Sequence, residues 1–307
     1  MIKTTINNLE MLQYDSLKNY CGISHFVTLR NCKDKSDPYD GFNICDYSGD
    51  SENHIKSCRK SLCEALNIDQ NNLVLPFQVH DNKIGIVSSP SEITDYDQIE
   101  SKFPSHQLNS DFSKEINSDK KPNRKFDALI CNKPGICIGI STADCVPVIL
   151  YSPKDSAIAA IHAGWRGTVK HIVYKCVIAL NKIYGVNSKD IIACIGPSIS
   201  PQKFETGPEV VIEFINAGYK DFYLKAINPN SGNSQIDIDK ETIDFSSKYF
   251  IDLWDTNKTD LINAGIDEKN IEISEICTYT NYNELFSARR IGIKSGRIAS
   301  VIMINKI

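Results

Sequence analysis

Four apolar, β-branched runs follow one another between residues 126 and 163, and they constrain the fold more than any other feature of the chain. They are FDALICN, ICIGISTA, VPVILYS and AIAAIHA. Apolar runs of this length between turn residues predict strands. Two earlier runs, LVLPFQVH ending at His80 and IGIVSS just after it, have the same character. The middle of the chain is therefore predicted to be a sheet.

Helical spacing of apolar residues follows in RGTVKHIVYKCVIALNKIYG and in ETIDFSSKYFIDLWDTNKTDLINAG, which stops at Gly265. Between Pro90 and Lys125 the sequence turns polar, and much of it has neither the helical nor the strand period. We interpret residues 90–125 as a surface insertion, either a lid or an unstructured loop. Since no repeat or linker divides the chain, a single α+β catalytic domain over residues 1–307 is predicted.

The net charge and the cysteine content indicate which class of partner the protein binds and in which cellular compartment it is expected. The formal net charge is only −4, and no stretch concentrates lysine and arginine, so a nucleic-acid partner is not expected and a small molecule is. The first twenty residues lack a signal peptide's basic and apolar regions, and no window is apolar enough for a membrane span. Eleven cysteines without a CxxC pair indicate reduced thiols. A cytoplasmic protein is expected, and the oligomeric state is left open.

Three segments place a metal-binding side chain beside a predicted strand end, where functional groups collect on rigid backbone. They carry His80, Cys145 and His162, in QVH, TADC and IHAGWRGT. Two imidazoles and one thiolate suit zinc, and three protein ligands leave a fourth position for water or substrate. Zinc in such a site supplies hydroxide for hydrolysis or deamination. These three residues are therefore both the candidate metal ligands and the candidate catalytic residues.

The same residues permit a second hypothesis. A chain with 11 cysteines and 6 histidines contains many His/Cys/His triplets by chance, and no spacing rule links residue 80 to residue 145. Cys145 could instead be a thiolate nucleophile activated by His80 or His162, which requires no metal. The residues by themselves leave both hypotheses open.

Other turns carry weaker signals. Gly164 and Gly167 bracket Trp165 and Arg166 before a helical pattern, which could form an anion-binding turn or ordinary packing. Near the C-terminus, CTYT and FSARR bring aromatic residues together with Arg289 and its neighbour. Paired arginines could hold a phosphate or simply form a solvated face.

Six blocks occur in order, and together they resemble one bacterial family. They are QVH, DALICNKPGICIGISTADCVPVILY, AIAAIHAGWRGT, IGPSISPQKFETG, CTYTN and LFSARR. The chain resembles the YfiH-like family, long labelled polyphenol oxidase or laccase-domain proteins and now regarded as purine nucleoside phosphorylases. The resemblance runs from about Ser24 to the C-terminus. TADCVPV and HAGWRGT are its most specific blocks.

The resemblance implies a four-layer α/β/β/α sandwich with mixed sheets, similar to the catalytic domain of cytotoxic necrotizing factor. It implies Zn²⁺ on the residues that match His80, Cys145 and His162. It also implies phosphorolysis of adenosine, inosine, guanosine or methylthioadenosine, with inorganic phosphate as co-substrate, and deamination of adenosine. Copper is less expected, because one His₂Cys site lacks the several coppers that oxygen reduction requires.

These activities need further side chains. For deamination, Asp144 is the candidate acid that moves protons to the leaving amine. Phosphorolysis needs cationic donors, for which Arg30, Arg166 and Arg289 are the candidates. Asn43 matches a family asparagine and is added to the expected substrate contacts.

The chain departs from the family pattern after Arg30, where NCKDKSDPYDGFN replaces a glycine-rich turn, and at Thr280, where the family has a second cysteine. The departure after Arg30 puts the N-terminal substrate contacts in doubt. Neither departure touches a proposed zinc ligand.

Three alternative functions stand beside the nucleoside enzyme. They are a Cys/His thiol hydrolase or amidase of peptidoglycan-like precursors, a copper-dependent polyphenol oxidase, and a non-catalytic metal or nucleoside sensor.

Overall fold

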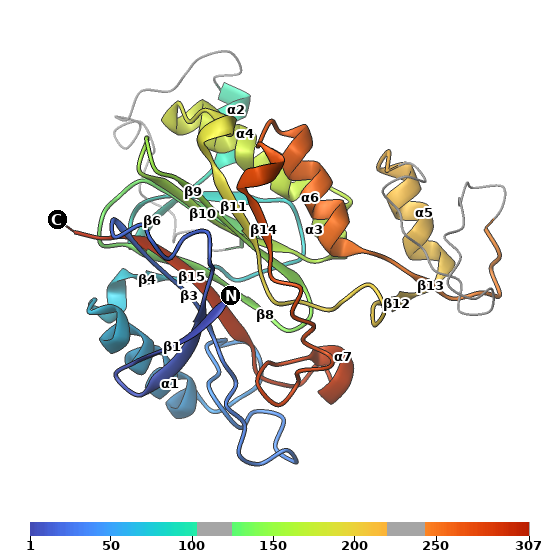
Figure 1. Cartoon of the computed structure of the whole chain (residues 1–307), viewed down its shortest axis with the longest axis horizontal. Helices are drawn as coiled ribbons and strands as arrows, with labels where there is room; N and C mark the ends of the chain where they lie inside the picture. Colours follow the sequence, from blue (N-terminus) through green and yellow to red (C-terminus); the bar gives the residue numbers. More distant parts are fainter. Residues whose placement is uncertain (103–124, 220–242, 307) are drawn as a thin grey trace.

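Two large sheets packed face to face form the centre of the protein, in a computed structural model that describes residues 1–102, 125–219 and 243–306 (Figure 1). Sheet A has the order β1-β2-β3-β15-β8-β4, and sheet B has the order β14-β11-β9-β10-β7-β5-β6. Sheet A consists of β1 (Ile2–Ile6), β2 (Leu9–Gln13), β3 (Ile23–Thr28), β15 (Ile298–Ile304), β8 (Cys137–Thr142) and β4 (Leu73–Val74). Sheet B consists of β14 (Ile271–Ile273), β11 (Ile192–Ile195), β9 (Val146–Ser152), β10 (Ala157–Ala163), β7 (Ala128–Cys131), β5 (Ile84–Ser89) and β6 (Glu92–Asp95).

Helices cover the outer faces of both sheets (Figure 1). The helices are α1 (Glu52–Leu66), α2 (Tyr96–Lys102), α3 (Trp165–Thr168), α4 (Ile172–Tyr184), α5 (Pro208–Asn216), α6 (Leu253–Asn263) and α7 (Ala288–Ile291). A small third sheet pairs β12 (Glu205–Thr206) with β13 (Tyr249–Phe250), and in Figure 1 it lies with α5 to the side of the sandwich. In the described part of the chain, no helix has the length and apolar content needed to span a bilayer.

Three apolar clusters define four layers. The first joins α1 to sheet A, the second fills the space between the sheets, and the third joins sheet B to α4 and α6. Leu62 packs with Phe26 and Val301 in the first cluster. The second cluster includes Val27 and Ile302 of sheet A with Leu129 and Ile158 of sheet B. The third includes Val148 and Ile161 of sheet B with Val177 of α4 and Leu261 of α6. The predicted mixed α+β sandwich in α/β/β/α order is thus confirmed, while its likeness to cytotoxic necrotizing factor stays a prediction.

The four apolar runs form β7, β8, β9 and β10, as predicted, and every residue in these strands is buried. Each strand has a covered face on both sides, which is why the runs are continuously apolar and do not alternate. The sequence does not show that β8 belongs to sheet A while the other three belong to sheet B.

The run LVLPFQVH is the main wrong strand prediction, because only Leu73–Val74 is a strand. Pro76 follows, and a proline has no N–H to donate to a ladder. Residues 75–83 instead cross from sheet A to sheet B, so His80 lies in a connection between sheets.

The two helical patterns are shorter than predicted. His171 has a left-handed φ of +52°, which separates α3 from α4 within the first pattern. In the second, Asp252 caps α6 by accepting the N–H of Asp255, and residues 249–250 form β13 instead. Helix α1, before the sheet-rich region, was not predicted.

The polar region 90–125 is only partly described, and its first part has regular structure. It contains β6 and α2, whose Tyr96 and Ile99 are buried in the same apolar cluster as residues of α4. The prediction of an unstructured surface loop is therefore wrong for these residues. Residues 103–124 lie outside the described part of the chain.

Two connections between the sheets lie at one end of the sandwich. Residues 75–83 join β4 to β5, and residues 143–145 join β8 to β9. Strand β10 ends at the same edge, because His162 pairs with Pro147 at the start of β9. The topology thus gathers segments far apart in the sequence at a single edge.

The stability of this sandwich should fall in mild acid because of His25. His25 lies in β3, is 1% exposed and stacks on Tyr14 with 5.9 Å between ring centroids. Burial lowers its pKa from 6.5 to about 4. Below pH 6.5 the unfolded chain therefore binds a proton at His25 that the folded chain does not bind. The free energy of unfolding falls by about 1.4 kcal/mol per pH unit until about pH 4.

We expect His25→Phe to remove this part of the pH dependence, measured by urea unfolding at pH 7 and pH 4.5. Other groups also titrate in this range, so the wild type and the variant are compared as differences between the two pH values. Equal pH dependence in both proteins would show that His25 makes no such contribution.

Candidate metal centre

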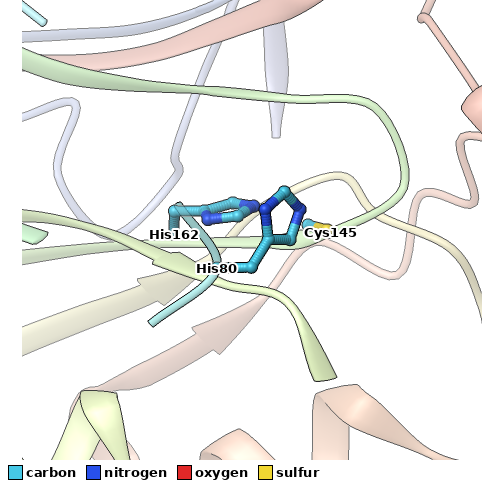
Figure 2. A group of neighbouring side chains, drawn as sticks. All are labelled: His80, Cys145 and His162. Atoms are coloured by element: carbon cyan, nitrogen blue, oxygen red, sulfur yellow. The ribbon is translucent and has the colours of Figure 1, made fainter. Parts of the chain in front are cut away.

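His80, Cys145 and His162 converge at the edge where the two connections cross (Figure 2). Their ligand atoms all lie within 4.8 Å of one another. The two imidazole rings have centroids 4.8 Å apart and are nearly perpendicular, at 86°. His162 is buried, Cys145 is partly buried and His80 is exposed, so the group reaches solvent on the His80 side.

A buried carboxylate behind the three residues fixes both histidines. Asp127, just before β7, is fully buried. It accepts the backbone N–H groups of Val79, His80 and Asp81 at 3.2, 2.9 and 2.8 Å. The same carboxylate lies 2.8 Å from Nδ1 of His162. Since the carboxylate accepts, Nδ1 of His162 carries the hydrogen and Nε2 is free to bind a metal.

Asp127 is not among the site residues predicted from the sequence, although a signal is present there. It is the single charged residue in the apolar run FDALICN. A charge in such a run has to find partners when the run is buried. Which partners it finds depends on the loop at residues 79–81, and this contact is not visible in the sequence.

A side-chain amide continues the strand pairing toward the site. Gln78 donates from Nε2 to the carbonyl of Ser141 at 2.8 Å, and its Oε1 accepts the N–H and hydroxyl of Ser141 at 2.8 and 3.0 Å. These bonds extend the parallel pairing of β4 with β8 by means of a side chain. The loop that carries His80 is therefore held to the strand that leads to Cys145.

The thiol of Cys145 and the imidazole of His162 each stabilise the charged form of the other. Burial opposes ionisation of Cys145, but the charge of His162 and hydrogen bonds from both histidines outweigh it and lower the pKa of the thiol. Burial also opposes the charged form of His162, yet the Cys145 thiolate and Asp127 raise its pKa. A thiolate is the form that binds metal and the form that attacks a substrate. The thiolate form suits both hypotheses for Cys145, and metal binding would in addition release the proton from Nε2 of His162.

Gly164 keeps the space beside the thiolate open. A Cβ at this position would lie 3.0 Å from Sγ of Cys145 and 3.5 Å from Cδ2 of His80. Its φ of −66° requires no glycine. The constraint on Gly164 is therefore the close approach of the site.

Asp144 is adjacent to Cys145, but its carboxylate is engaged in the scaffold. Its φ is +87°, one oxygen accepts the hydroxyl of Thr278 at 2.7 Å, and the other accepts the N–H of Arg289 at 2.7 Å. These bonds tie the turn before Cys145 to the C-terminal segments. The geometry gives Asp144 a positioning role and does not support the expected role as a proton donor.

Arg30 and Asn43 are also corrections to the expected substrate contacts. Arg30 is fully buried, and its guanidinium donates to the carbonyls of Asp37, Asp40 and Tyr282. Asn43 is fully buried and bonded to Ser48, Asp50, Cys45 and Arg297. Both side chains hold loops at the site end of the sandwich, and neither reaches solvent.

Arg166 and Arg289 are the two exposed arginines of the expected set. Arg166 lies over the ring of Trp165, 4.2 Å from its centroid. Arg289 donates to the carbonyl of Glu205 at 2.9 Å and lies 5.6 Å from the ring centroid of Phe204. Arg166 follows His162 by four residues, and Arg289 binds Asp144 through its backbone. Both cations thus belong to segments that adjoin the site.

The donor set fits a metal ion. Two imidazoles and a thiolate are zinc ligands, and a carboxylate bonded to the far nitrogen of a ligating histidine is the usual outer support. Within residues 1–102, 125–219 and 243–306, no other group of three or more His, Cys, Asp or Glu side chains gathers closely enough to hold a metal.

Comparison with known proteins places the chain among enzymes. Residues 24–305 match the family model described as "Multi-copper polyphenol oxidoreductase laccase". A purine nucleoside phosphorylase of Bacteroides thetaiotaomicron is 39% identical, over 96% of this chain and 97% of that protein. Adenosine deaminase RL5, from an unknown prokaryotic organism, is 32% identical over 94% and 97%. The crystal structure of the hypothetical protein YfiH of Bacillus licheniformis has a TM-score of 0.76 at 25% identity, covering 96% of both chains. The expected resemblance is confirmed.

Replacing Asp127 should weaken metal binding without removing a ligand. In Asp127→Asn, the amide cannot accept all four N–H groups, so His80 and His162 lose their fixed orientation. Loss of such outer support typically lowers metal affinity about 10- to 100-fold. We expect a fall of this size for Zn²⁺ in competition with a chelating dye.

Asp260→Asn is the matched control, because Asp260 is also buried and also bonded to Nδ1 of a histidine, His171, at 3.1 Å. It contributes nothing to the triad, so its zinc affinity should stay near wild type. Equal losses in the two variants would indicate general destabilisation and contradict the role given to Asp127.

Proposed function

Because this chain belongs to the multi-copper polyphenol oxidoreductase laccase family, we propose that it is a zinc-dependent enzyme that phosphorolyses purine nucleosides and deaminates adenosine. The relatives named as purine nucleoside phosphorylase and adenosine deaminase support both activities. The observation that carries the proposal is the group formed by His80, Cys145 and His162, which is open to solvent at His80 and supported by Asp127.

Zinc is favoured over the several coppers of the family description. Oxygen reduction by four electrons requires several copper sites, whereas the described residues provide one group of three ligands. When bound, zinc would supply Lewis acidity and an open coordination position. Asp127 keeps Nε2 of His162 available by holding the hydrogen on Nδ1.

Phosphorolysis breaks the bond from N9 of the purine to C1′ of the ribose, forms a bond from a phosphate oxygen to C1′, and leaves a proton on the base. Catalysis of such a step depends on placing phosphate against C1′ and stabilising charge. Arg166 and Arg289 are exposed cations on segments that adjoin the site, and we assign them to phosphate. Asp144 holds the backbone of Arg289 and thereby positions it.

Adenosine, inosine, guanosine and methylthioadenosine are the proposed nucleosides. Deamination adds water at C6 of adenosine and releases ammonia. Both reactions act on the same class of molecule, so one site next to one metal centre can serve both.

A thiol hydrolase or amidase is the second candidate, because Cys145, His162 and Asp127 also form a nucleophile, base and orienting carboxylate in the usual order. Such an enzyme needs Cys145 and His162 but not His80 and not a metal. Removal of metal therefore separates the two candidates.

The decisive assay incubates metal-quantified protein with adenosine, with and without phosphate, and follows adenine, inosine and hypoxanthine by chromatography. Adenine that appears only with phosphate demonstrates phosphorolysis, and inosine demonstrates deamination. We expect chelation to abolish both activities and Zn²⁺ to restore them. Activity that persists without metal would transfer the assignment to the thiol mechanism.

Cys145→Ser should lose bound zinc and at least a hundredfold of the activity, because a neutral hydroxyl replaces a thiolate ligand. Cys194→Ser is the matched control. Cys194 is buried and lies 3.2 Å from the hydroxyl of Ser16, a contact that serine can keep. A Cys145→Ser protein with full zinc content and full turnover would contradict the proposed site.

A further inference from the structure

Exposed apolar side chains gather on the loop that carries His80 and on the turn at Tyr47 that packs against this loop. Phe77 is 46% exposed, and Val79 and Tyr47 are each 38% exposed. Gln78, between Phe77 and Val79, is buried and points to Ser141. The alternation turns two apolar side chains outward immediately before His80, which is itself exposed.

This apolar surface is rigid. The rings of Tyr47 and Phe77 have centroids 4.7 Å apart and are tilted by 55°. The hydroxyl of Tyr47 lies 3.2 Å from that of Ser141 and accepts the N–H of Gln78 at 3.4 Å. Asp127 fixes the backbone of Val79 from below. The side chains therefore cannot relieve their exposure by folding the loop inward.

Apolar area held in water beside a reactive centre is typical of a ligand contact. The surface consists of three residues, which suits one flat ring and is small for a protein partner. Cations occur on other segments next to the same centre, at Arg166 and Arg289. An apolar contact and separate cations match a ligand that combines a planar base with phosphate.

We propose that Tyr47, Phe77 and Val79 form the surface on which the purine ring lies, and that the ring is recognised through its face. This inference rests on the proposed nucleoside function and names the residues that select its substrate. Stacking on an aromatic side chain tolerates different bases, because every base has a π-face. The surface therefore admits adenosine, inosine and guanosine alike, whereas contacts to the base edge would distinguish them.

The test uses purified zinc-loaded protein and two readouts. Steady-state phosphorolysis gives KM and kcat for adenosine, inosine and guanosine. Binding of 2-aminopurine riboside without phosphate gives a turnover-independent signal, because its fluorescence is quenched when it stacks on an aromatic ring. Three substitutions, Phe77→Ala, Phe77→Leu and Phe77→Tyr, separate loss of the ring from loss of apolar area.

We expect Phe77→Ala to raise KM about tenfold or more for all three nucleosides, with a smaller change in kcat and loss of quenching. Phe77→Tyr should retain both properties. Phe77→Leu should bind the probe with weaker quenching, because the ring of Tyr47 remains. Phe245→Ala is the matched control, since Phe245 is 73% exposed and lies on another segment, and it should behave as wild type.

The outcomes distinguish the two proposals. A wild-type protein that neither binds the probe nor turns over any purine nucleoside refutes the proposed function. A wild-type protein that is active while Phe77→Ala keeps its KM and its quenching refutes the purine surface alone. A KM increase for one nucleoside only would also refute it, because it would indicate recognition of the base edge.

Discussion

The rest of the site depends on the hydrogen bonds that the buried carboxylate of Asp127 accepts. A charge that loses its water must be compensated by hydrogen bonds. Asp127 accepts three consecutive backbone N–H groups from the His80 loop and one from the ring of His162. The same bonds that stabilise the charge hold His80 in its left-handed conformation, with φ at +60°. Satisfying one buried group thus orients two ligands on different segments.

The two-sheet topology explains why the recognisable blocks of the sequence lie so far apart. Strands β4 and β8 both run toward one end of sheet A, and the chain crosses from each of them to sheet B there. Asp144 joins this edge to Thr278 and Arg289, and Gln78 joins it to β8. These segments are distant in sequence because the chain runs through buried strands between one visit to this end of the sandwich and the next. What the blocks share is one end of the sandwich.

The fold could be predicted where burial alone determines the residue type. Strands β7 to β10 are covered on both faces, so their sequences are uniformly apolar and easily recognised. The three members of the candidate metal centre could be proposed from the chemistry of their side chains, although the strand predicted to end at His80 is a connection between the sheets. Asp127 and Arg30 could not be placed in this way, because their roles depend on backbone groups that are distant in the sequence. Asp127 binds N–H groups 46 to 48 residues away, and the farthest carbonyl that Arg30 binds is 252 residues away. A polar residue in a sequence does not show whether its partner will be substrate or carbonyl oxygen.

His80, Cys145 and His162 come together only when both sheets have formed and packed. His80 and Cys145 lie on connections between the sheets, and His162 lies near the end of β10. An ion that binds all three would therefore bind the native chain and not the unfolded one. By mass action, a free ion at about a hundred times its dissociation constant adds about 2.7 kcal/mol to the folding free energy. The supply of metal would then govern the lifetime of the chain as well as its chemistry, because the apo protein would be more open to unfolding and to proteases.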